Sequence, residues 1–502
     1  MSRSSRRGLG SATESGGSVR GGTTMRLAMT TAGKEIRRRL ATTVITALAA
    51  RPGRKLGLAG RVIDALPFFP LTSEVGRAFA KRLAAGDCTF IDFVARLGNE
   101  LSERSMDRLV SNLLVNAWVD GRPIRERFHE QEGFYPPNFI VISPTMRCNL
   151  RCPGCWAALY EDVPHMEMEL LERIVSECRN ELGVRFFTIA GGEPFIRKDL
   201  LDFYDRHDDC YFLVYTNGLL IDDETVDRLG IAGNVAPMLS VEGRRDSTDR
   251  RRGGGTYAAL SEVRKRLSDA GVLHGFSVTA TRDNVYEVSS EEFIDEMIDE
   301  GALVGWYFHY IPIGRDPDPS LMLTAQERDD LRRRVFALRT SRPIFLADFW
   351  NDGPAVQGCM AGGQRYLHIN PEGDVEPCVF AHFAVDNVRE KSIREALRHP
   401  FMAAIREGIP YDGNLLMPCM IIDRPAVLRR LCAEHGARPT HPGATSLLGE
   451  FAGELDRKAA SLADVMRGVW DRDEWQHLYV GGTEVAAQRG AESKSGDKVM
   501  AH

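Results

Sequence analysis

The chain has 502 residues, with 64 Lys and Arg against 70 Asp and Glu, and therefore a formal charge of −6. Hydrophobic residues make up 43% of it and charged residues 27%, as in an average soluble protein. This length suggests two or three domains, and the charge gives no overall basic field that would attract nucleic acid. No apolar run is long enough to predict a membrane-spanning helix. Ten cysteines are too few for a disulfide scaffold, so their positions carry more information than their number.

The two ends of the chain differ in composition from its middle. Residues 1–32 are mostly Gly, Ser, Thr and Arg, and residues 483–502 are rich in Ala, Gly, Ser and Lys. Such compositions cannot bury a core, so we expect a disordered tail at each end. The N-terminal tail is also basic, which would allow peripheral contact with an anionic membrane surface.

Residues 33–132 have the pattern of a helical domain. Apolar side chains recur at three- and four-residue steps, as in Phe90, Phe93, Val94 and Leu97. The segment 57–72 is unusually apolar. Packing between helices explains it, and contact with a membrane or a lipid substrate is the alternative.

From residue 136 to residue 345, short apolar runs alternate with amphipathic segments. Strands are predicted at 139–145, 186–191, 211–216, 236–241, 275–280 and 305–313. Each is followed by a predicted helix, the last of them at 324–339. Six strand–helix units in series favour an α/β fold built as a partial (β/α)6 TIM-like barrel, with an open doubly wound sheet as the alternative.

Three cysteines, Cys148, Cys152 and Cys155, follow the first predicted strand. Three thiolates within eight residues can converge on an iron–sulfur cluster or on one zinc ion. A four-iron cluster held by three cysteines keeps one iron open to another ligand, whereas an electron carrier would close that position with a fourth cysteine. No cysteine follows until Cys178, inside a predicted helix, so the spacing favours a cluster that binds a substrate.

This CxxxCxxC loop resembles that of the radical S-adenosylmethionine (radical SAM) superfamily. The resemblance implies a [4Fe–4S] cluster whose open iron chelates S-adenosylmethionine (SAM), and reductive cleavage of SAM to methionine and a 5′-deoxyadenosyl radical. The radical then abstracts hydrogen from a C–H bond. The chain departs from the family at Gly154, where an aromatic residue near the adenine is usual. Trp156 could take over that contact.

Polar residues stand at the ends of the next four predicted strands. The second strand runs into Gly191, Gly192, Glu193 and Pro194, which resembles the GGEP motif that receives the methionine amino group of SAM. The glycines would let the backbone approach the ligand, and the carboxylate could accept a bond from an ammonium. The resemblance implies contacts with the ribose and carboxylate of SAM for residues at the later strand ends: Asn217, Ser240, Glu242, Ser277 and Arg282. Singly, these residues also suit turns and helix caps.

The basic, glycine-rich stretch 250–257 follows the fourth strand. We expect a flexible loop there, with a lid near SAM as the alternative.

A second set of cysteines, Cys359, Cys378 and Cys419, lies beyond the predicted barrel. Residues 366–375 between the first two are predicted to form a β-hairpin with a Pro-Glu-Gly-Asp turn, which would bring Cys359 and Cys378 together. The stretch resembles a SPASM or twitch extension and implies a second, auxiliary iron–sulfur cluster, with structural zinc as the alternative. Its fourth ligand stays open between Cys432, Asp423, a substrate and none.

The expected layout thus has a helical domain at 33–132, a radical SAM partial barrel at 136–345, a loop-rich SPASM/twitch-like extension at 346–435 and a helical tail at 436–482. The expected function is that of an oxidoreductase or maturase that removes hydrogen from a peptide, a lipid or a small metabolite, for oxidation or bond formation. A non-catalytic iron–sulfur electron carrier or sensor is the alternative, but it would have no use for a GGEP motif.

The resemblance also implies a reducing partner such as flavodoxin or ferredoxin. Oxygen-labile clusters and free cysteines fit a reducing compartment, so the chain is expected in the cytoplasm.

Overall fold

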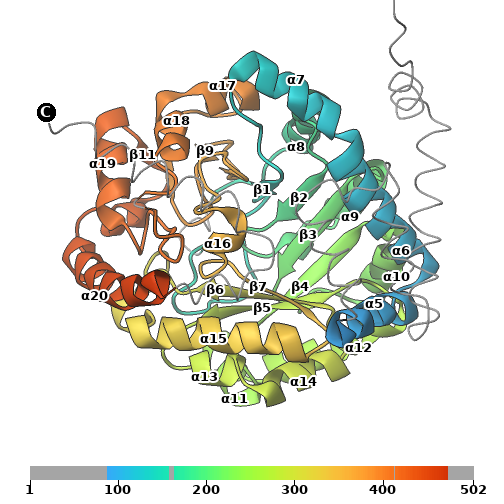
Figure 1. Ribbon diagram of the computed structural model, residues 1–502. Helices are drawn as coiled ribbons and strands as arrows, with labels where there is room; N and C mark the ends of the chain where they lie inside the picture. The colour runs from blue at the N-terminus through green and yellow to red at the C-terminus, as the bar shows by residue number, and fades with distance from the viewer. Residues whose placement is uncertain (1–86, 158–162, 412, 473–502) are drawn as a thin grey trace, which may run out of the picture.

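The computed structural model describes residues 87–157, 163–411 and 413–472. Both predicted tails and the apolar segment 57–72 lie outside these residues. The six predicted strands are present and run parallel in one sheet (Figure 1). They are β1 (Ile140–Ile142), β2 (Phe186–Ile189), β3 (Tyr211–Thr216), β4 (Val235–Val241), β5 (Gly275–Ala280) and β6 (Val304–His309).

Helices cover the outer face of this sheet because each buries one apolar stripe against it. In α8 (Met168–Glu177), for example, Leu170, Leu171, Ile174 and Val175 are buried at helical spacing. The other helices between the strands are η3 (Cys178–Leu182), η4 (Pro194–Ile196), α9 (Asp199–Arg206), α10 (Asp223–Ala232), α11 (Arg245–Arg252), α12 (Thr256–Asp269), α13 (Val285–Val288), α14 (Glu291–Asp299), η5 (Pro319–Leu321) and α15 (Ala325–Ser341).

Three further strands extend the sheet beyond the six. A seventh parallel strand, β7 (Phe345–Asp348), pairs with β6, and the predicted hairpin forms β8 (His368–Ile369) and β9 (Val375–Glu376). β8 pairs in parallel with β1, so the sheet order is β7-β6-β5-β4-β3-β2-β1-β8-β9. The two edges, β7 and β9, do not pair with each other. The sheet is therefore an open, partial barrel, which confirms the predicted fold class.

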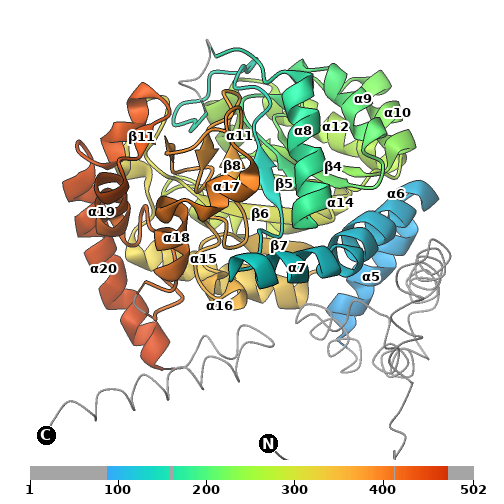
Figure 2. The same ribbon diagram turned by 90° about the horizontal axis from the view of Figure 1, so that it is seen from above.

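Among the described residues, four helical segments precede the barrel: α5 (Cys88–Glu100), α6 (Glu103–Arg108), η2 (Leu109–Asp120) and α7 (Arg122–Glu132). Figure 2 shows α5, α6 and α7 running together along one side of the barrel. Met106 and Val110 form one apolar cluster with Tyr211 and Leu303, which lie where β3 and β6 begin. The N-terminal helices therefore pack at the end of the barrel opposite the cysteine loop that follows β1.

The C-terminal part consists of short helices and two small strands. They are α16 (Gly353–Val356), β10 (Phe383–Ala384), α17 (Ile393–Arg398), α18 (Pro400–Glu407), α19 (Pro425–His435), β11 (Arg438–Pro439), η6 (Pro442–Leu447) and α20 (Ala452–Asp471). The long helix α20 packs against both α15 and α19, so it joins the barrel to this region (Figure 1). Within the described ranges, no helix is both long and apolar enough to cross a membrane.

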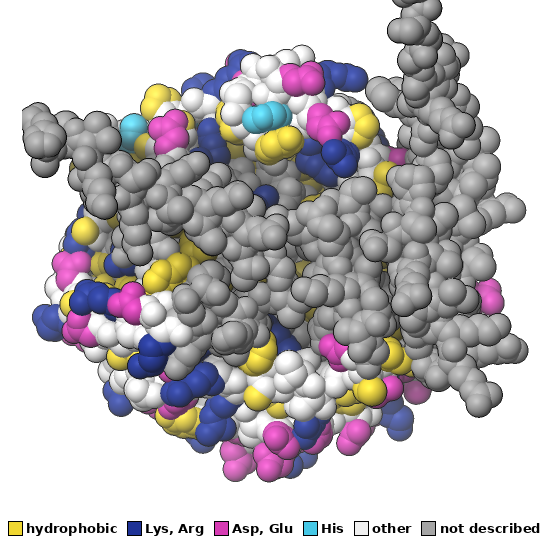
Figure 3. Space-filling model, in the orientation of Figure 1, with side chains coloured by type: hydrophobic (Ala, Val, Ile, Leu, Met, Phe, Trp, Pro, Cys, Tyr) yellow, Lys and Arg dark blue, Asp and Glu magenta, His cyan; other side chains and the backbone are white. Residues whose placement is uncertain are grey.

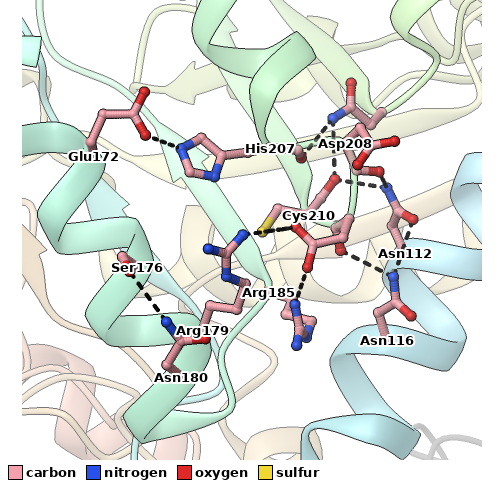
Figure 4. Close-up of polar contacts among 12 residues, drawn as sticks. Asn112, Asn116, Glu172, Ser176, Arg179, Asn180, Arg185, His207, Asp208 and Cys210 are labelled. Atoms are coloured by element: carbon pink, nitrogen blue, oxygen red, sulfur yellow. Dashed lines mark hydrogen bonds and ion pairs between the residues drawn. The ribbon is translucent and has the colours of Figure 1, made fainter. Parts of the chain in front are cut away.

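A buried amide fastens the N-terminal helices to the barrel (Figure 4). The side chain of Asn112 is fully buried, and its Nδ2 donates to the carbonyls of Asp208 (2.8 Å) and Cys210 (2.9 Å). Asn116, one turn later, donates to the Asp209 carbonyl at 3.1 Å. These bonds give a donor to each of three consecutive carbonyl groups, those of residues 208–210, in the turn that leads into β3.

We expect Asn112→Ala to lower the free energy of unfolding by about 1–3 kcal/mol, because it leaves the Asp208 carbonyl without its donor and the Cys210 carbonyl with the longer bond from Asn234 Nδ2 (3.3 Å). Asn180→Ala is the matched control, since the exposed Asn180 lies in the same region and its side chain bonds Ser176 at 3.2 Å. Denaturant unfolding of the reconstituted chain measures both. Equal midpoints for the two variants would show that Asn112 does not fasten the helices.

Candidate functional site

The first cysteine loop leaves the end of β1 and is held by backbone hydrogen bonds. The N–H of Gly154 donates to the carbonyl of Arg315 (2.7 Å), and the N–H of Arg315 donates to the carbonyl of Cys155 (3.0 Å). Desolvation raises the pKa of the Cys148 thiol to about 11, and the nearby Cys155 and Cys152 thiols add to the rise. The loop therefore holds three sulfurs within electrostatic reach of one another, an arrangement that a positively charged group would stabilise.

The two glycines of the GGEP motif pack against this loop. A Cβ added to Gly191 would lie 2.1 Å from the Thr145 carbonyl oxygen, and one added to Gly192 would lie 2.2 Å from that of Arg147. Glu193 N–H donates to the same Arg147 carbonyl at 2.8 Å. The sequence predicted that these glycines let the backbone approach a ligand. In the structure, these glycines allow the backbone of the cysteine loop to pack against the end of β2.

Glu193 joins the ends of β2 and β3 through its carboxylate. The side chain is fully buried; Oε1 accepts from Thr216 Oγ1 (2.8 Å) and Phe195 N–H (3.0 Å), and Oε2 accepts from Asn217 N–H (2.7 Å). Burial raises the pKa of this carboxyl group. Asn217 in turn donates from Nδ2 to Asn149 Oδ1 at 2.7 Å, inside the cysteine loop. Glu193 and Asn217 thus connect the cysteine loop to the ends of β2 and β3. Pro194 begins the short helix η4 beside them.

The ends of β4 and β5 contribute a hydroxyl pair and a buried ion pair. Ser240 and Ser277 face each other across the two strands, with 3.4 Å between their Oγ atoms. Glu242 is 2% exposed and pairs with Arg251 (2.7 Å) and Arg252 (2.6 Å). These predicted residues therefore lie on one rim of the barrel, as the strand-end argument requires.

Arg251 and Arg252 are site residues that the sequence argument missed. They lie on α11, where a flexible loop was expected, and Arg251 donates to the carbonyls of Pro153 (3.2 Å) and Gly154 (3.3 Å) in the cysteine loop. A buried carboxylate without a cationic partner costs free energy. If Glu242 is buried, the run of three arginines at 250–252 is the nearby part of the sequence that could supply such a partner. Arg282, by contrast, is half-exposed and lies 3.5 Å from Glu327 of α15.

Tyr310 fills the space beside Gly154. A Cβ added at Gly154 would lie 2.7 Å from Cε2 of the Tyr310 ring, and Gly154 has a φ of +66°. Trp156, which the sequence suggested for the adenine contact, instead packs against His368, Phe380 and His382. The aromatic ring nearest to position 154 thus comes from the end of β6.

The second cysteine set comes together as the hairpin predicts. The thiols of Cys359, Cys378 and Cys419 interact electrostatically, and burial raises the pKa of each, to about 11 for Cys378 and about 12 for Cys419. The Tyr366 hydroxyl lies 2.9 Å from the Cys378 sulfur. Cys432 is buried in α19, and burial alone raises its pKa.

A chain of buried polar side chains connects the two cysteine sets. Ser143, at the start of the first loop, bonds His368 of β8 (2.7 Å), and His368 bonds Glu376 of β9 (2.5 Å), two residues before Cys378. His382 and His441 form a second buried pair, with 2.6 Å between Nδ1 and Nε2. Because these contacts are buried, they fix the two cysteine segments relative to each other.

A cavity of about 180 Å³ lies among the end of β6, the start of α15 and α20. Tyr310, packed against Gly154, forms one wall, and Ile422, three residues beyond Cys419, forms another. The half-buried Lys458 of α20 lines it as well. Figure 3 shows Lys and Arg side chains, with some Asp and Glu among them, on the face where Figure 1 places α20 and α15. The cavity is a candidate place for a substrate to meet the chain.

Two family models match this chain. Residues 142–299 match that of the radical SAM superfamily, and residues 359–423 match that of an iron-sulfur cluster-binding domain, SPASM. The chain therefore contains a radical SAM domain followed by a SPASM domain. It is an iron–sulfur enzyme whose cofactors are a [4Fe–4S] cluster and SAM, with an auxiliary iron–sulfur cluster in the SPASM domain.

Curated relatives share about a quarter of their residues with this radical SAM chain. The PqqA peptide cyclase of Gluconobacter oxydans is 26% identical over 274 residues, which cover 52% of this chain and 76% of the relative. That of Granulibacter bethesdensis is 28% identical over 313 residues, 58% of this chain and 80% of the relative. Among solved structures, Streptococcus suis SuiB bound to precursor peptide SuiA aligns with a TM-score of 0.49 and 21% identity, over 57% of this chain and 70% of that one.

The residues present fit these cofactors. Soft thiolate donors suit iron–sulfur clusters, and each cysteine set offers three of them. In the described part of the chain, no three His, Cys, Asp or Glu side chains converge as closely as the ligands of a single metal ion. Cluster ligands bind separate iron atoms and lie further apart.

We expect Gly154→Ala to destabilise the radical SAM loop, because it combines a left-handed backbone with a clash against Tyr310. The backbone conformation alone costs about 1–2 kcal/mol. Gly436→Ala is the control, since Gly436 has a similar φ of +61° and nothing within 4 Å of its added Cβ. Adding Tyr310→Ala should recover part of the Gly154→Ala loss. Additive effects in this double-mutant cycle would contradict the predicted contact.

The buried histidine pair predicts acid sensitivity. Burial lowers the pKa of His382 and of His441 to about 4, whereas the unfolded chain protonates them near 6.5. Stability is therefore complete above pH 6.5 and falls as the pH drops toward 4, by up to about 1.4 kcal/mol per pH unit for each histidine. His441→Asn should make this slope shallower in denaturant titrations, and His435→Gln, at the end of α19, should not. Equal slopes for these variants would refute the assignment.

Proposed function

We propose that Cys148, Cys152 and Cys155 hold the SAM-binding cluster and that the enzyme abstracts hydrogen from a C–H bond of a peptide. The observation that carries the proposal is the rim of the barrel, where the ends of β2 and β3 and the helix α11 that follows β4 all bond to the same cysteine loop. The relatives are peptide cyclases by name, which favours a peptide over a lipid or a small metabolite as the substrate.

The roles of the chain's own residues follow from their contacts. When bound and reduced, the cluster cleaves SAM to methionine and a 5′-deoxyadenosyl radical. Gly191 and Gly192 hold the loop at the end of β2. Glu193, also after β2, accepts from Asn217 after β3, and Asn217 donates to Asn149 in the loop. Most of the Glu193 carboxylate is already occupied by bonds from the chain, so we assign it to holding the loop rather than to binding the ammonium of SAM directly.

Charge at the rim suits a zwitterionic ligand. Arg251 and Arg252 share the buried Glu242, so this cluster carries one net positive charge beside the loop. We propose that it faces the carboxylate of SAM, a contact that the sequence argument left open among the strand-end residues, Arg282 included. Ser240 and Ser277 offer neighbouring hydroxyls for the ribose. Arg282, turned toward Glu327, remains a candidate only if that exposed pair opens.

Cys359, Cys378 and Cys419 are proposed to hold an auxiliary cluster that accepts an electron from the substrate radical or positions the substrate. Oxidation after hydrogen abstraction releases one electron and one proton, and the auxiliary cluster would take the electron. A reducing partner such as flavodoxin or ferredoxin and a cytoplasmic location fit such oxygen-labile groups. Membrane contact through the N-terminal region rests on residues outside the described ranges.

We expect the anaerobically reconstituted enzyme to produce 5′-deoxyadenosine from SAM and dithionite, and Cys152→Ala to abolish it. Cys419→Ala should keep this cleavage and reduce the iron content from about eight to about four atoms per chain. Cys88→Ala, in neither set, is the control and should change neither value. Chromatography of the nucleoside and an iron assay measure the outcome. An iron-loaded chain that leaves SAM intact would support the carrier alternative instead.

A further inference from the structure

The proposed auxiliary cluster, on which this inference rests, has three cysteine ligands for four iron atoms. The two side chains that the sequence offered for the fourth position are poorly placed. Both oxygens of Asp423 are engaged, by the buried Arg328 and by the Cys419 N–H (2.9 Å). Burial alone raises the pKa of Cys432, whereas the other three thiols also act on one another. Neither residue therefore completes the set.

Tyr411 offers a buried oxygen that the rest of the described chain leaves unused. Its hydroxyl oxygen is inaccessible to water and has no hydrogen-bond partner among the described residues. A buried hydroxyl without a partner costs free energy, so such groups in proteins nearly always have a ligand, a water or another polar atom to bond. Gly408 packs against one face of the Tyr411 ring, because a Cβ added at Gly408 would lie only 3.1 Å from ring atom Cε1.

The segment before Tyr411 packs next to the first of the three cysteines. A Cβ added at Gly358, the neighbour of Cys359, would lie 2.8 Å from Cγ2 of Ile409 and 3.7 Å from Cβ of Pro410. Tyr411 also interacts electrostatically with all three thiols, Cys359, Cys419 and Cys378, and they join burial in raising its pKa. Tyr411 thus lies within electrostatic reach of all three thiols, as a fourth ligand of the same cluster would.

We propose that the phenol oxygen of Tyr411 is the fourth ligand of the auxiliary cluster. The iron–oxygen bond forms as the O–H bond breaks, and the proton leaves to solvent without any change in oxidation state. The positive charge of bound iron would stabilise the phenolate oxygen. With four ligands from the chain, the auxiliary cluster has no open iron. It then serves electron transfer and does not bind the substrate directly.

The test uses the full chain with Cys148, Cys152 and Cys155 all changed to Ala, so that only the auxiliary cluster remains after anaerobic reconstitution. Resonance Raman spectra excited in the iron–phenolate charge-transfer band should show phenolate modes in this parent protein. They should be lost in Tyr411→Phe and retained in the control Tyr366→Phe, whose hydroxyl meets the Cys378 sulfur instead. Mild oxidation should convert Tyr411→Phe, but not the control, to a three-iron cluster visible by EPR.

Each outcome decides between distinct claims. Phenolate modes that are absent from the parent, or that persist in Tyr411→Phe, overturn Tyr411 ligation and leave the auxiliary cluster standing. A folded parent that binds no iron overturns the auxiliary cluster itself. If Tyr411→Phe holds no cluster, Tyr411→Cys decides: recovery of about four irons supports ligation at this position, and failure to recover them overturns it.

Discussion

The structure depends on backbone pairing between the GGEP segment and the first cysteine loop. The N–H groups of Gly192 and Glu193 donate to the carbonyls of Thr145 and Arg147, three residues and one residue before Cys148. Any side chain at Gly191 or Gly192 would overlap those carbonyl groups. The loop therefore takes its shape from β2. Preorganisation of this kind lowers the conformational entropy that cofactor binding would otherwise have to remove.

Buried charge supports the same loop from two sides. Glu193 is surrounded by three donors from the chain, and Glu242 by two arginines. A buried ion pair contributes little net stability, but removal of one partner leaves an uncompensated charge and is strongly destabilising. The arrangement therefore contributes little net stability. It specifies the conformation instead, because each carboxylate bonds its partners in only one position of the strand end that it contacts.

Much of this could be predicted from local sequence, because six short apolar runs and a Pro-Glu-Gly-Asp turn define their own strands and hairpin. What failed depends on contacts between distant segments. β7 is a strand only because β6 lies beside it, and 250–252 are helical where glycines suggested a loop. Arg282 stands at a strand end, yet its side chain turns toward α15. The spacing of the cysteines predicted both sets, but nothing in it pointed to Tyr411, or to Tyr310, which packs against Gly154 from a distant part of the chain.

The two cysteine sets share one rigid frame. β8 pairs directly with β1, with Val141 opposite His368 and Ile142 opposite Ile369, and each strand runs into a cysteine segment. The bonds from Ser143 to His368 and from His368 to Glu376 cross the same junction. The separation between the two sets is thus determined by sheet register, not by the length of the linking chain. A one-residue slip of β8 would turn His368 away from Ser143 and break both bonds, so register and polar network reinforce each other.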